Sequence, residues 1–210
     1  MTIVLYDYWR SSSAYRLRIA LNLLGLRYQS RSVNLLKDEQ SEPAHLARNP
    51  QGLVPVLEID GQRMTQSLAI IEYLSERHAA GLLPEDAEQR HRARALAYVI
   101  AMDIQPVCNL KVVKYAVAAG GSTTTQSWMH HFITEGFSAF EAMLGDAFVG
   151  PFALGRHPTI VDICLVPQAY NAQRWGVELS AYPRLASIVI AMATLPEVAA
   201  AHPDLVKPID

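Results

Sequence analysis

Three consecutive serines, Ser11, Ser12 and Ser13, stand between a short apolar segment and a stretch with helical periodicity. The apolar segment, residues 2–6, has the composition of a buried strand, and the periodic stretch predicts a helix. Hydroxyl groups at a helix N-terminus donate hydrogen bonds to an anion that the helix dipole already favours, and a thiolate is one such anion. Plain N-caps without a ligand explain the three serines equally well.

Two other short segments could bind a peptide backbone or a carboxylate. Val54 and Pro55 follow a turn and open a strand, where a cis peptide bond would leave the backbone before the proline free to pair with a ligand. An ordinary trans proline at a strand start is the alternative. Gln66 and Ser67 open a helix whose first-turn amides would bind a carboxylate, unless these residues serve only as caps.

Several other kinds of chemistry are excluded. A dithiol enzyme of the thioredoxin kind would have two cysteines in the turn that holds the serines, whereas the two cysteines of this chain are Cys108 and Cys164. The spacing of metal-ligating residue types predicts no metal site. The chain also lacks the glycine-rich phosphate-binding fingerprint and the G-x-S-x-G sequence of α/β-hydrolases.

Composition predicts a globular protein. Of the 210 residues, 50% are hydrophobic and 18% are charged, which excludes a disordered chain. The 18 basic and 20 acidic residues give a formal charge of −2, so we expect neither a nucleic acid nor a membrane surface as partner. The amino end lacks the pattern of a secretory signal, and two cysteines favour a reducing cytoplasm. Polar residues within the least charged stretch, residues 95–110, predict a buried helix and not a membrane span.

The elements that must position these residues follow from periodicity and turn signals. Up to about residue 80 the predicted order is β-α-β-α-β-β-α, a small α/β unit. Its strands are expected at residues 2–6, 28–35, 54–59 and 62–64, with Asp60 and Gly61 as the turn of a hairpin. Its helices are expected after Ser13, with Gly25 close to the C-cap, over 42–48 and from Gln66.

The periodicity of the residues after about residue 80 predicts helices. A linker with Pro84 separates residues 1–81 from residues 87–210, which gives two domains. One long helix is expected over residues 87–118 and another over residues 123–144. Thr159 and Asp162 have the spacing of a capping box, which predicts a helix that continues through Pro167 to about Arg174.

These segments together resemble the zeta-class glutathione transferases, the maleylacetoacetate isomerases, along essentially the whole chain. The resemblance is carried by the motif over residues 10–21, RSSSAYRLRIAL, and by NPQGLVP at residues 49–55. It is also carried by QSLAIIEYL at residues 66–74, LLP at 82–84, IQPVCN at 104–109 and TIVD at 159–162. Two positions depart from the usual motif, since Ser13 replaces a cysteine and Tyr15 replaces a tryptophan.

The resemblance implies a thioredoxin-like domain over residues 1–81 that binds glutathione and an all-helical domain over residues 87–210 that binds substrate. It further implies a homodimer. By analogy, Ser11 activates the glutathione thiol with Ser12 close by, and a cis Pro55 follows Val54, which pairs with the cysteinyl backbone. Gln66 and Ser67 hold the γ-glutamyl end, and Gln105 makes a further contact with glutathione.

The activity that the resemblance implies is a glutathione-dependent cis-trans isomerisation of a maleyl diacid, chiefly maleylacetoacetate to fumarylacetoacetate in tyrosine and phenylalanine breakdown. Guanidinium groups bind carboxylates bidentately, so Arg10, directly before Ser11, is an expected substrate-binding residue, and the resemblance implies the same role for Arg174. A solvated surface charge is the alternative for each arginine. Three alternatives stay open: a maleylpyruvate isomerase, a general detoxifying transferase and a non-catalytic module that binds a partner protein. Ser13 casts more doubt on side activities than on isomerisation.

Overall fold

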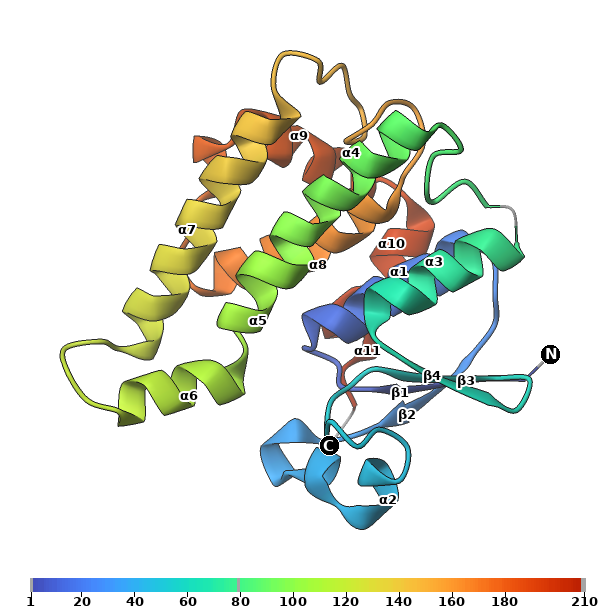
Figure 1. The fold of residues 1–210 in the computed structure, drawn as a ribbon, viewed down its shortest axis with the longest axis vertical. Coiled ribbons are helices and arrows are strands. Elements are labelled where there is room, and N and C mark those ends of the chain that lie inside the picture. Colours follow the sequence, from blue (N-terminus) through green and yellow to red (C-terminus); the bar gives the residue numbers. More distant parts are fainter. Residues whose placement is uncertain (1, 79, 209–210) are drawn as a thin grey trace. The chain divides into compact units, whose positions relative to one another are not determined.

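The computed structural model describes residues 2–78 and 80–208, and its contacts divide the chain into two compact units. The first unit comprises Met1–Gly81 and Leu195–Asp210, and the second comprises Leu82–Thr194. Residues 1, 79, 209 and 210, which the two predicted domains include, lie outside the described residues. Figure 1 shows the elements of both units along the chain.

A four-stranded mixed sheet forms the centre of the first unit. Its strands are β1 (Ile3–Asp7), β2 (Gln29–Ser32), β3 (Val56–Ile59) and β4 (Gln62–Thr65), in the order β2-β1-β3-β4. Strand β1 is parallel to β2 and antiparallel to β3, and β3 is antiparallel to β4. This is the predicted thioredoxin-like arrangement, although β2 is shorter than the expected strand over residues 28–35.

Helices cover the sheet on both faces. Figure 1 shows α1 (Ser12–Leu23) and α3 (Ser67–Arg77) on one side of the sheet and α2 (Pro43–Leu46) on the other. The short turns η1 (Leu35–Lys37) and η2 (Glu39–Ser41) lead from β2 to α2. The core includes Leu5 and Leu57, which are opposite each other in the β1–β3 register.

Helix α1 and strand β3 end at the turn residues that the sequence predicts. Helix α1 ends where Gly25 adopts a φ of 64° and the N–H of Leu26 donates to the carbonyl of Leu21, a Schellman motif. Strands β3 and β4 join through Asp60 and Gly61, whose φ angles of 49° and 78° are those of a tight hairpin turn.

The C-terminal segment returns to the first unit. Its helices α10 (Pro196–Ala200) and α11 (Pro203–Val206) belong there, and α10 contacts α1. The sequence prediction placed these residues in the helical domain, whereas the contacts of the structure group them with the first unit. The physical reason is that Asn22 and Arg18 on α1 need acceptors, and they find them 2.9 Å and 3.0 Å away in the carbonyls of Glu197 and Ala201.

The second unit is helical, as expected, but its first helix is broken. In place of one helix over residues 87–118 the structure has α4 (Ala87–Tyr98), the π-helical segment η3 (Val99–Ile104), α5 (Gln105–Val107) and α6 (Leu110–Ala118). The reason for the break is local. Pro106 lacks an N–H for the helical ladder, and the Asn109 side chain accepts a hydrogen bond from the N–H of Lys111, which starts a new helix.

The second unit continues with the helices α7 (Thr125–Leu144), α8 (Ile160–Arg174) and α9 (Pro183–Ala193), and the short 3-10 helix η4 (Leu179–Ala181) lies between α8 and α9. Helix α8 is the most buried of them and contacts α4 and α9. It begins at the predicted capping box and continues through Pro167, as expected. Helix α7 passes close to η3 at Gly136, where a Cβ atom would overlap the side chain of Ile104.

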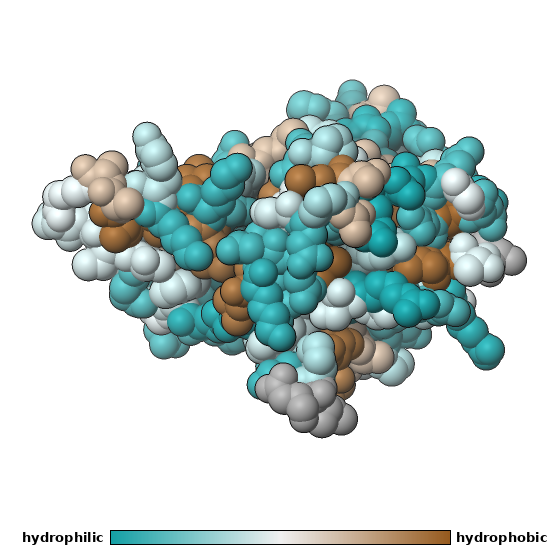
Figure 2. Space-filling view, turned by 90° about the horizontal axis from the view of Figure 1, so that it is seen from below, coloured by the Kyte–Doolittle hydropathy of each residue, from teal (hydrophilic) through white to brown (hydrophobic). Residues whose placement is uncertain are grey.

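On the face in Figure 2, hydrophobic residues occur as separate groups among hydrophilic ones. Among the described residues, no single helix has the length and apolar character needed to cross a membrane. The pair Ala87–Val107 and Leu110–Ala118 meets that criterion only when the two are taken together across a bend of 42°.

Candidate functional site

The sheet register brings three of the predicted site segments of the first unit to one edge. Tyr6, near the end of β1, is opposite Val56, and Val56 is opposite Thr65. The chain therefore leaves β1 toward Ser11, enters β3 from Pro55 and leaves β4 toward Ser67 at the same end of the sheet. Residues separated by more than fifty positions in the sequence share this edge because antiparallel neighbours align their opposite ends.

Ser11 is the N-cap of α1. Its Oγ accepts a hydrogen bond from the N–H of Ala14 at 3.3 Å, and its own N–H donates to the carbonyl of Tyr8 at 2.8 Å. The capping role of the serines is thus confirmed for Ser11. Because the Oγ acts as an acceptor toward the helix, its single O–H remains available to donate to a ligand, so capping and ligand binding are compatible. Ser12 is the first residue of α1.

A buried ion pair holds the turn that carries Ser11. Arg18, which is 1% exposed, lies 2.7 Å from Asp7 at the end of β1, and its Nη2 donates to the carbonyl of Trp9 at 2.9 Å. Burial raises the pKa of the Asp7 carboxyl, and the charge and hydrogen bonds of Arg18 oppose that shift. The turn is therefore tied to both β1 and α1.

Arg10 lies on aromatic rings in this turn. Its guanidinium is 4.9 Å from the centroid of the Trp9 ring, and its Nη2 donates to the hydroxyl of Tyr8 at 3.1 Å. The ammonium of Lys207 is 5.5 Å from the centroid of the same indole. The described contacts of Arg10 therefore restrict its guanidinium to the aromatic pair beside Ser11.

The Val54–Pro55 peptide bond is cis, as predicted. The loop before it is held by two side chains that donate to one carbonyl. The carbonyl of Leu53 lies 3.0 Å from Nε2 of the buried His45 and 2.9 Å from Nδ2 of Asn49. These bonds anchor the backbone immediately before Val54. A second cis bond, Gly150–Pro151, was not predicted.

Gln66 occupies the N-cap position of α3 and Ser67 is the first residue of the helix, but no side-chain capping hydrogen bond forms there. Gln66 has a φ of 69°, which is rare outside glycine, and its side chain forms no capping hydrogen bond. Its amide donates instead to Oε1 of Gln51 at 2.9 Å. Ser67 is 6% exposed, and its Oγ accepts a hydrogen bond from Nη1 of Arg16 at 3.3 Å. The alternative in which these two residues are only caps is therefore wrong.

Two predicted site residues belong to the second unit. Gln105 is the first residue of the short helix α5 and is partly exposed. Arg174 is the last residue of α8 and is exposed. The first unit thus holds Arg10, Ser11, Ser12, Val54, Pro55, Gln66 and Ser67, while Gln105 and Arg174 are placed by the helices of the second.

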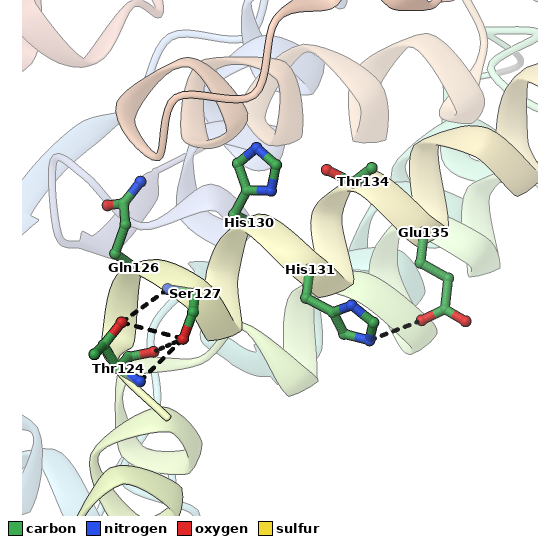
Figure 3. Close-up of a pocket in the computed structure, with 7 residues that line it drawn as sticks. All are labelled: Thr124, Gln126, Ser127, His130, His131, Thr134 and Glu135. Atoms are coloured by element: carbon green, nitrogen blue, oxygen red, sulfur yellow. Dashed lines mark hydrogen bonds and ion pairs between the residues drawn. The ribbon is translucent and has the colours of Figure 1, made fainter. Parts of the chain in front are cut away.

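The two surface pockets described in this structure contain none of the predicted residues. One, of about 630 Å³, runs along α7 beside His130 and His131, and the other, of about 650 Å³, lies at the end of α1 beside α10. In Figure 3 the rings of His130 and His131 point away from each other, as their adjacency on a helix predicts, and His131 pairs with Glu135 at 3.6 Å. Among the described residues, no three His, Cys, Asp or Glu side chains form a group that could hold a metal ion.

The sequence did not single out the buried arginines Arg16 and Arg18 individually, and both proved central to this edge. Each is 1% exposed. The signal that could have found them is their position in the apolar stretch of residues 14–21, where a charged side chain must be buried on the core face and therefore needs partners. The pairs they form could not be read from the sequence.

The donor set at this edge suits an anionic peptide. It combines a hydroxyl at the N-terminus of α1, a hydroxyl at the N-terminus of α3 and a buried guanidinium beside the latter. Helix N-termini and guanidinium groups both favour negative charge. A peptide with a thiolate and carboxylates, such as glutathione, has the complementary groups.

Comparisons with known proteins agree with this chemistry. Residues 1–76 match the N-terminal domain of glutathione S-transferases. The maleylacetoacetate isomerase of Rhizobium meliloti (strain 1021) is 56% identical over 208 residues, which cover 98% of both chains.

Solved structures also match essentially the whole chain. A maleylpyruvate isomerase, described as a bacterial zeta-class glutathione S-transferase, superimposes with a TM-score of 0.93 at 38% identity and covers 99% of this chain and 100% of its own. The maleylacetoacetate isomerase of Anaeromyxobacter dehalogenans 2CP-1, with glutathione bound in its active site, has a TM-score of 0.89 at 43% identity and covers 100% of this chain and 98% of its own. The chain therefore belongs to the zeta-class glutathione transferases, the family of the maleylacetoacetate isomerases.

Proposed function

We propose that this protein is a glutathione-dependent isomerase that converts a cis maleyl diacid to its trans isomer, with maleylacetoacetate as substrate and fumarylacetoacetate as product. The observation that carries the proposal is the convergence of the segments of Ser11, Val54 and Ser67 at one edge of the sheet. The 56% identity to a maleylacetoacetate isomerase supports the choice of substrate.

Bound glutathione would supply a thiolate that adds reversibly to the carbon–carbon double bond, leaving a single bond that rotates before elimination restores the thiolate. The role of Ser11 is to stabilise that thiolate with its O–H, assisted by the first-turn N–H groups of α1 and with Ser12 close by. This stabilisation requires neither a metal nor a redox group. It also explains why the turn holds hydroxyls where a dithiol enzyme has cysteines.

Other residues hold the ends of the tripeptide. Val54 offers its backbone to the cysteinyl unit, and Gln66 and Ser67 hold the γ-glutamyl carboxylate at the N-terminus of α3. Gln105 makes a further contact with glutathione. Residues 1–81 then act as the glutathione-binding part of the chain, and the helical residues from 87 onward supply the substrate contacts.

The maleyl diacid brings carboxylates of its own. Arg10 and Arg174 are the proposed partners, because a guanidinium binds a carboxylate through two parallel N–H groups and stays charged. The stacking of Arg10 on Trp9 supports this role, since a preordered guanidinium loses less freedom when it binds.

Maleylpyruvate is the second candidate substrate. The structure with the TM-score of 0.93 is a maleylpyruvate isomerase. In both compounds the cis double bond lies between a carboxylate and a ketone. Two broader alternatives are a general detoxifying transferase and a non-catalytic module that binds a partner protein. Retention of Ser11 favours an enzyme over the module.

The proposal is tested by assaying the purified protein with glutathione against maleylacetoacetate and maleylpyruvate side by side. We expect isomerisation of maleylacetoacetate without net consumption of glutathione. Faster turnover of maleylpyruvate would reassign the substrate, and efficient conjugation of chlorodinitrobenzene without isomerisation would make the protein a general transferase. Absence of all three activities would favour the binding module.

We further propose a cytoplasmic homodimer that acts in tyrosine and phenylalanine breakdown. The family resemblance supports the dimer, and α6 exposes Tyr115, Leu110 and Val112, apolar side chains that association could cover. Cys108 and Cys164 form no disulfide bond, which suits a reducing compartment. Light scattering from the purified protein tests the dimer, and a monomeric mass at assay concentration would contradict it.

A further inference from the structure

A buried arginine contacts the serine that begins α3. Arg16, on α1, is 1% exposed, and its Nη1 lies 3.3 Å from Oγ of Ser67, which is itself 6% exposed. The two residues are 51 positions apart in the sequence, and the packing of α1 against α3 brings them together. The contact lies one residue from Gln66, at the sheet edge that carries the proposed glutathione site.

The chemistry of the two groups determines the direction of this hydrogen bond. A guanidinium has five N–H donors and no acceptor, so Ser67 must accept through its Oγ. The single hydroxyl hydrogen of Ser67 then points away from Arg16. Arg16 therefore holds Ser67 as a donor and does not compete for its hydrogen.

The positive charge of Arg16 also favours a carboxylate bound at Ser67. The guanidinium is permanently protonated and lies almost wholly out of solvent beside the first turn of α3. The unpaired N–H groups of a helix N-terminus already carry partial positive charge. A carboxylate that accepts the Ser67 hydrogen would therefore meet a positive potential that water screens only weakly.

We propose that Arg16 is a positioning residue for the γ-glutamyl carboxylate of glutathione and acts through the hydroxyl of Ser67. The inference rests on the proposed function, because it assumes that glutathione places this carboxylate at Ser67. Arg16 does not touch the thiol or the diacid. Its effect should therefore appear in the affinity for glutathione and not in the turnover of the bound complex.

A double-mutant cycle measured by calorimetric binding of glutathione tests this role. The proteins are the parent, Arg16→Gln, Ser67→Ala and the double variant. Each single substitution is expected to weaken glutathione binding by roughly 10- to 100-fold, the usual effect of losing a hydrogen bond to a charged group. Since Arg16 acts through Ser67, the double variant should bind no more than about threefold more weakly than Ser67→Ala alone.

Two further measurements separate positioning from general structural damage. Cysteinylglycine, which lacks the γ-glutamyl residue, should bind in competition to the parent and to Arg16→Gln with affinities within about twofold of each other. With maleylacetoacetate as substrate, Arg16→Gln should raise the KM for glutathione and leave kcat within about threefold of the parent. Damage to the fold would weaken both ligands and lower kcat.

Arg16→Lys keeps the experiment decisive if Arg16→Gln does not fold. The lysine keeps a buried cation that can donate one hydrogen bond to Ser67. This variant should therefore bind glutathione more tightly than Arg16→Gln and less tightly than the parent. If only the lysine variant folds, glutathione binding at the parent affinity overturns the positioning role, and loss of affinity for glutathione but not for cysteinylglycine supports it.

The outcomes distinguish this inference from the proposed function. If Ser67→Ala binds glutathione as the parent does, the carboxylate does not lie at Ser67, and both the proposed placement of glutathione and the role of Arg16 fail. The isomerase function itself is decided by the isomerisation assay. If Ser67→Ala binds weakly but Arg16→Gln binds as the parent does, only the role of Arg16 is wrong. The role of Arg16 is also wrong if the loss of glutathione affinity in the double variant equals the product of the losses in the two single variants, because the two residues then act independently.

Discussion

Arg18 and Asp7 form a buried ion pair in which one guanidinium nitrogen lies 2.8 Å from Oδ1 and 2.7 Å from Oδ2. The remaining nitrogens of Arg18 donate to the carbonyl of Trp9 and to that of Ala201, 183 positions along the chain. A single side chain thus joins the end of β1, the turn before Ser11 and the C-terminal segment.

Removal of one partner of this pair should be strongly destabilising. We expect Asp7→Asn to lower the free energy of unfolding by about 3 to 5 kcal/mol, because it leaves the Arg18 cation buried without its counter-charge. Urea unfolding measures the change. Asp146→Asn is the matched control, since Asp146 accepts a hydrogen bond from Arg184 at 2.9 Å but is fully exposed, and we expect a far smaller change. Equal effects of the two substitutions would contradict the importance of burial.

Replacement of the capping hydroxyl of α1 should affect chemistry more than binding. We expect Ser11→Ala to lower kcat for isomerisation by roughly 10- to 100-fold, the effect of losing a hydrogen bond of about 1.5 to 3 kcal/mol to a thiolate. The affinity for glutathione should change less. Ultraviolet titration of bound glutathione should show that its thiol ionises at a higher pH in the variant. Unchanged turnover in Ser11→Ala, together with loss of activity in Ser12→Ala, would transfer the leading role to Ser12.

Lysine substitutions test the proposed arginine pair. Arg10→Lys and Arg174→Lys keep the charge but lose the bidentate hydrogen bonding of the guanidinium. Each should therefore reduce isomerisation of the diacid, while the affinity for glutathione stays within about twofold of that of the parent. Steady-state kinetics with both diacids and calorimetric binding of glutathione provide the readouts. If both variants isomerise both substrates at the parent rate, these arginines do not bind the substrate and a transferase of broad specificity becomes the better interpretation.

The two capping boxes of the second unit provide a matched comparison of burial. Thr159 and Thr124 both cap long helices, but Thr159 is 7% exposed and its partner Asp162 also accepts from the N–H of Ala153, whereas Thr124 lies at the surface. We expect Thr159→Ala to cost about 2 kcal/mol of stability and Thr124→Ala about 0.5 to 1 kcal/mol. Thermal unfolding compares them, and a larger effect of Thr124→Ala would show that burial does not set the difference.

The thiol of Cys108 should be unreactive in the folded protein. Burial raises the pKa of this thiol to about 11, so it stays protonated at pH 8, and iodoacetamide should modify it only after unfolding. Because the unfolded chain releases this proton near pH 9 and the folded chain near pH 11, ionisation of Cys108 favours unfolding as the pH rises through this interval.

Comparison with Cys108→Ala isolates this contribution to alkaline stability. The variant removes the thiol, so its melting temperature should fall less than that of the parent between about pH 9 and pH 11. Rapid alkylation of the native parent at pH 8, or identical alkaline behaviour of the two proteins, would show that Cys108 is not held as a protonated thiol.

The sequence by itself determined the features that depend on near neighbours. The hairpin at Asp60 and Gly61, the C-cap of α1 at Gly25 and the capping box of Thr159 and Asp162 were all predicted and are all present. Each depends on backbone preferences or on hydrogen bonds that span only a few residues. Periodicity likewise identified the strands and most helices, and the short motifs identified the family.

Only the tertiary structure decided the features that depend on distant partners. The pairing of Arg16 with Ser67 spans 51 residues and that of Arg18 with Ala201 spans 183, and no local pattern specifies either. The return of the C-terminal segment to the first unit has the same origin, since it satisfies polar groups on α1 with backbone carbonyls that any residue could supply. Composition can predict that a buried arginine needs acceptors, but the packing of the helices determines which acceptors it finds.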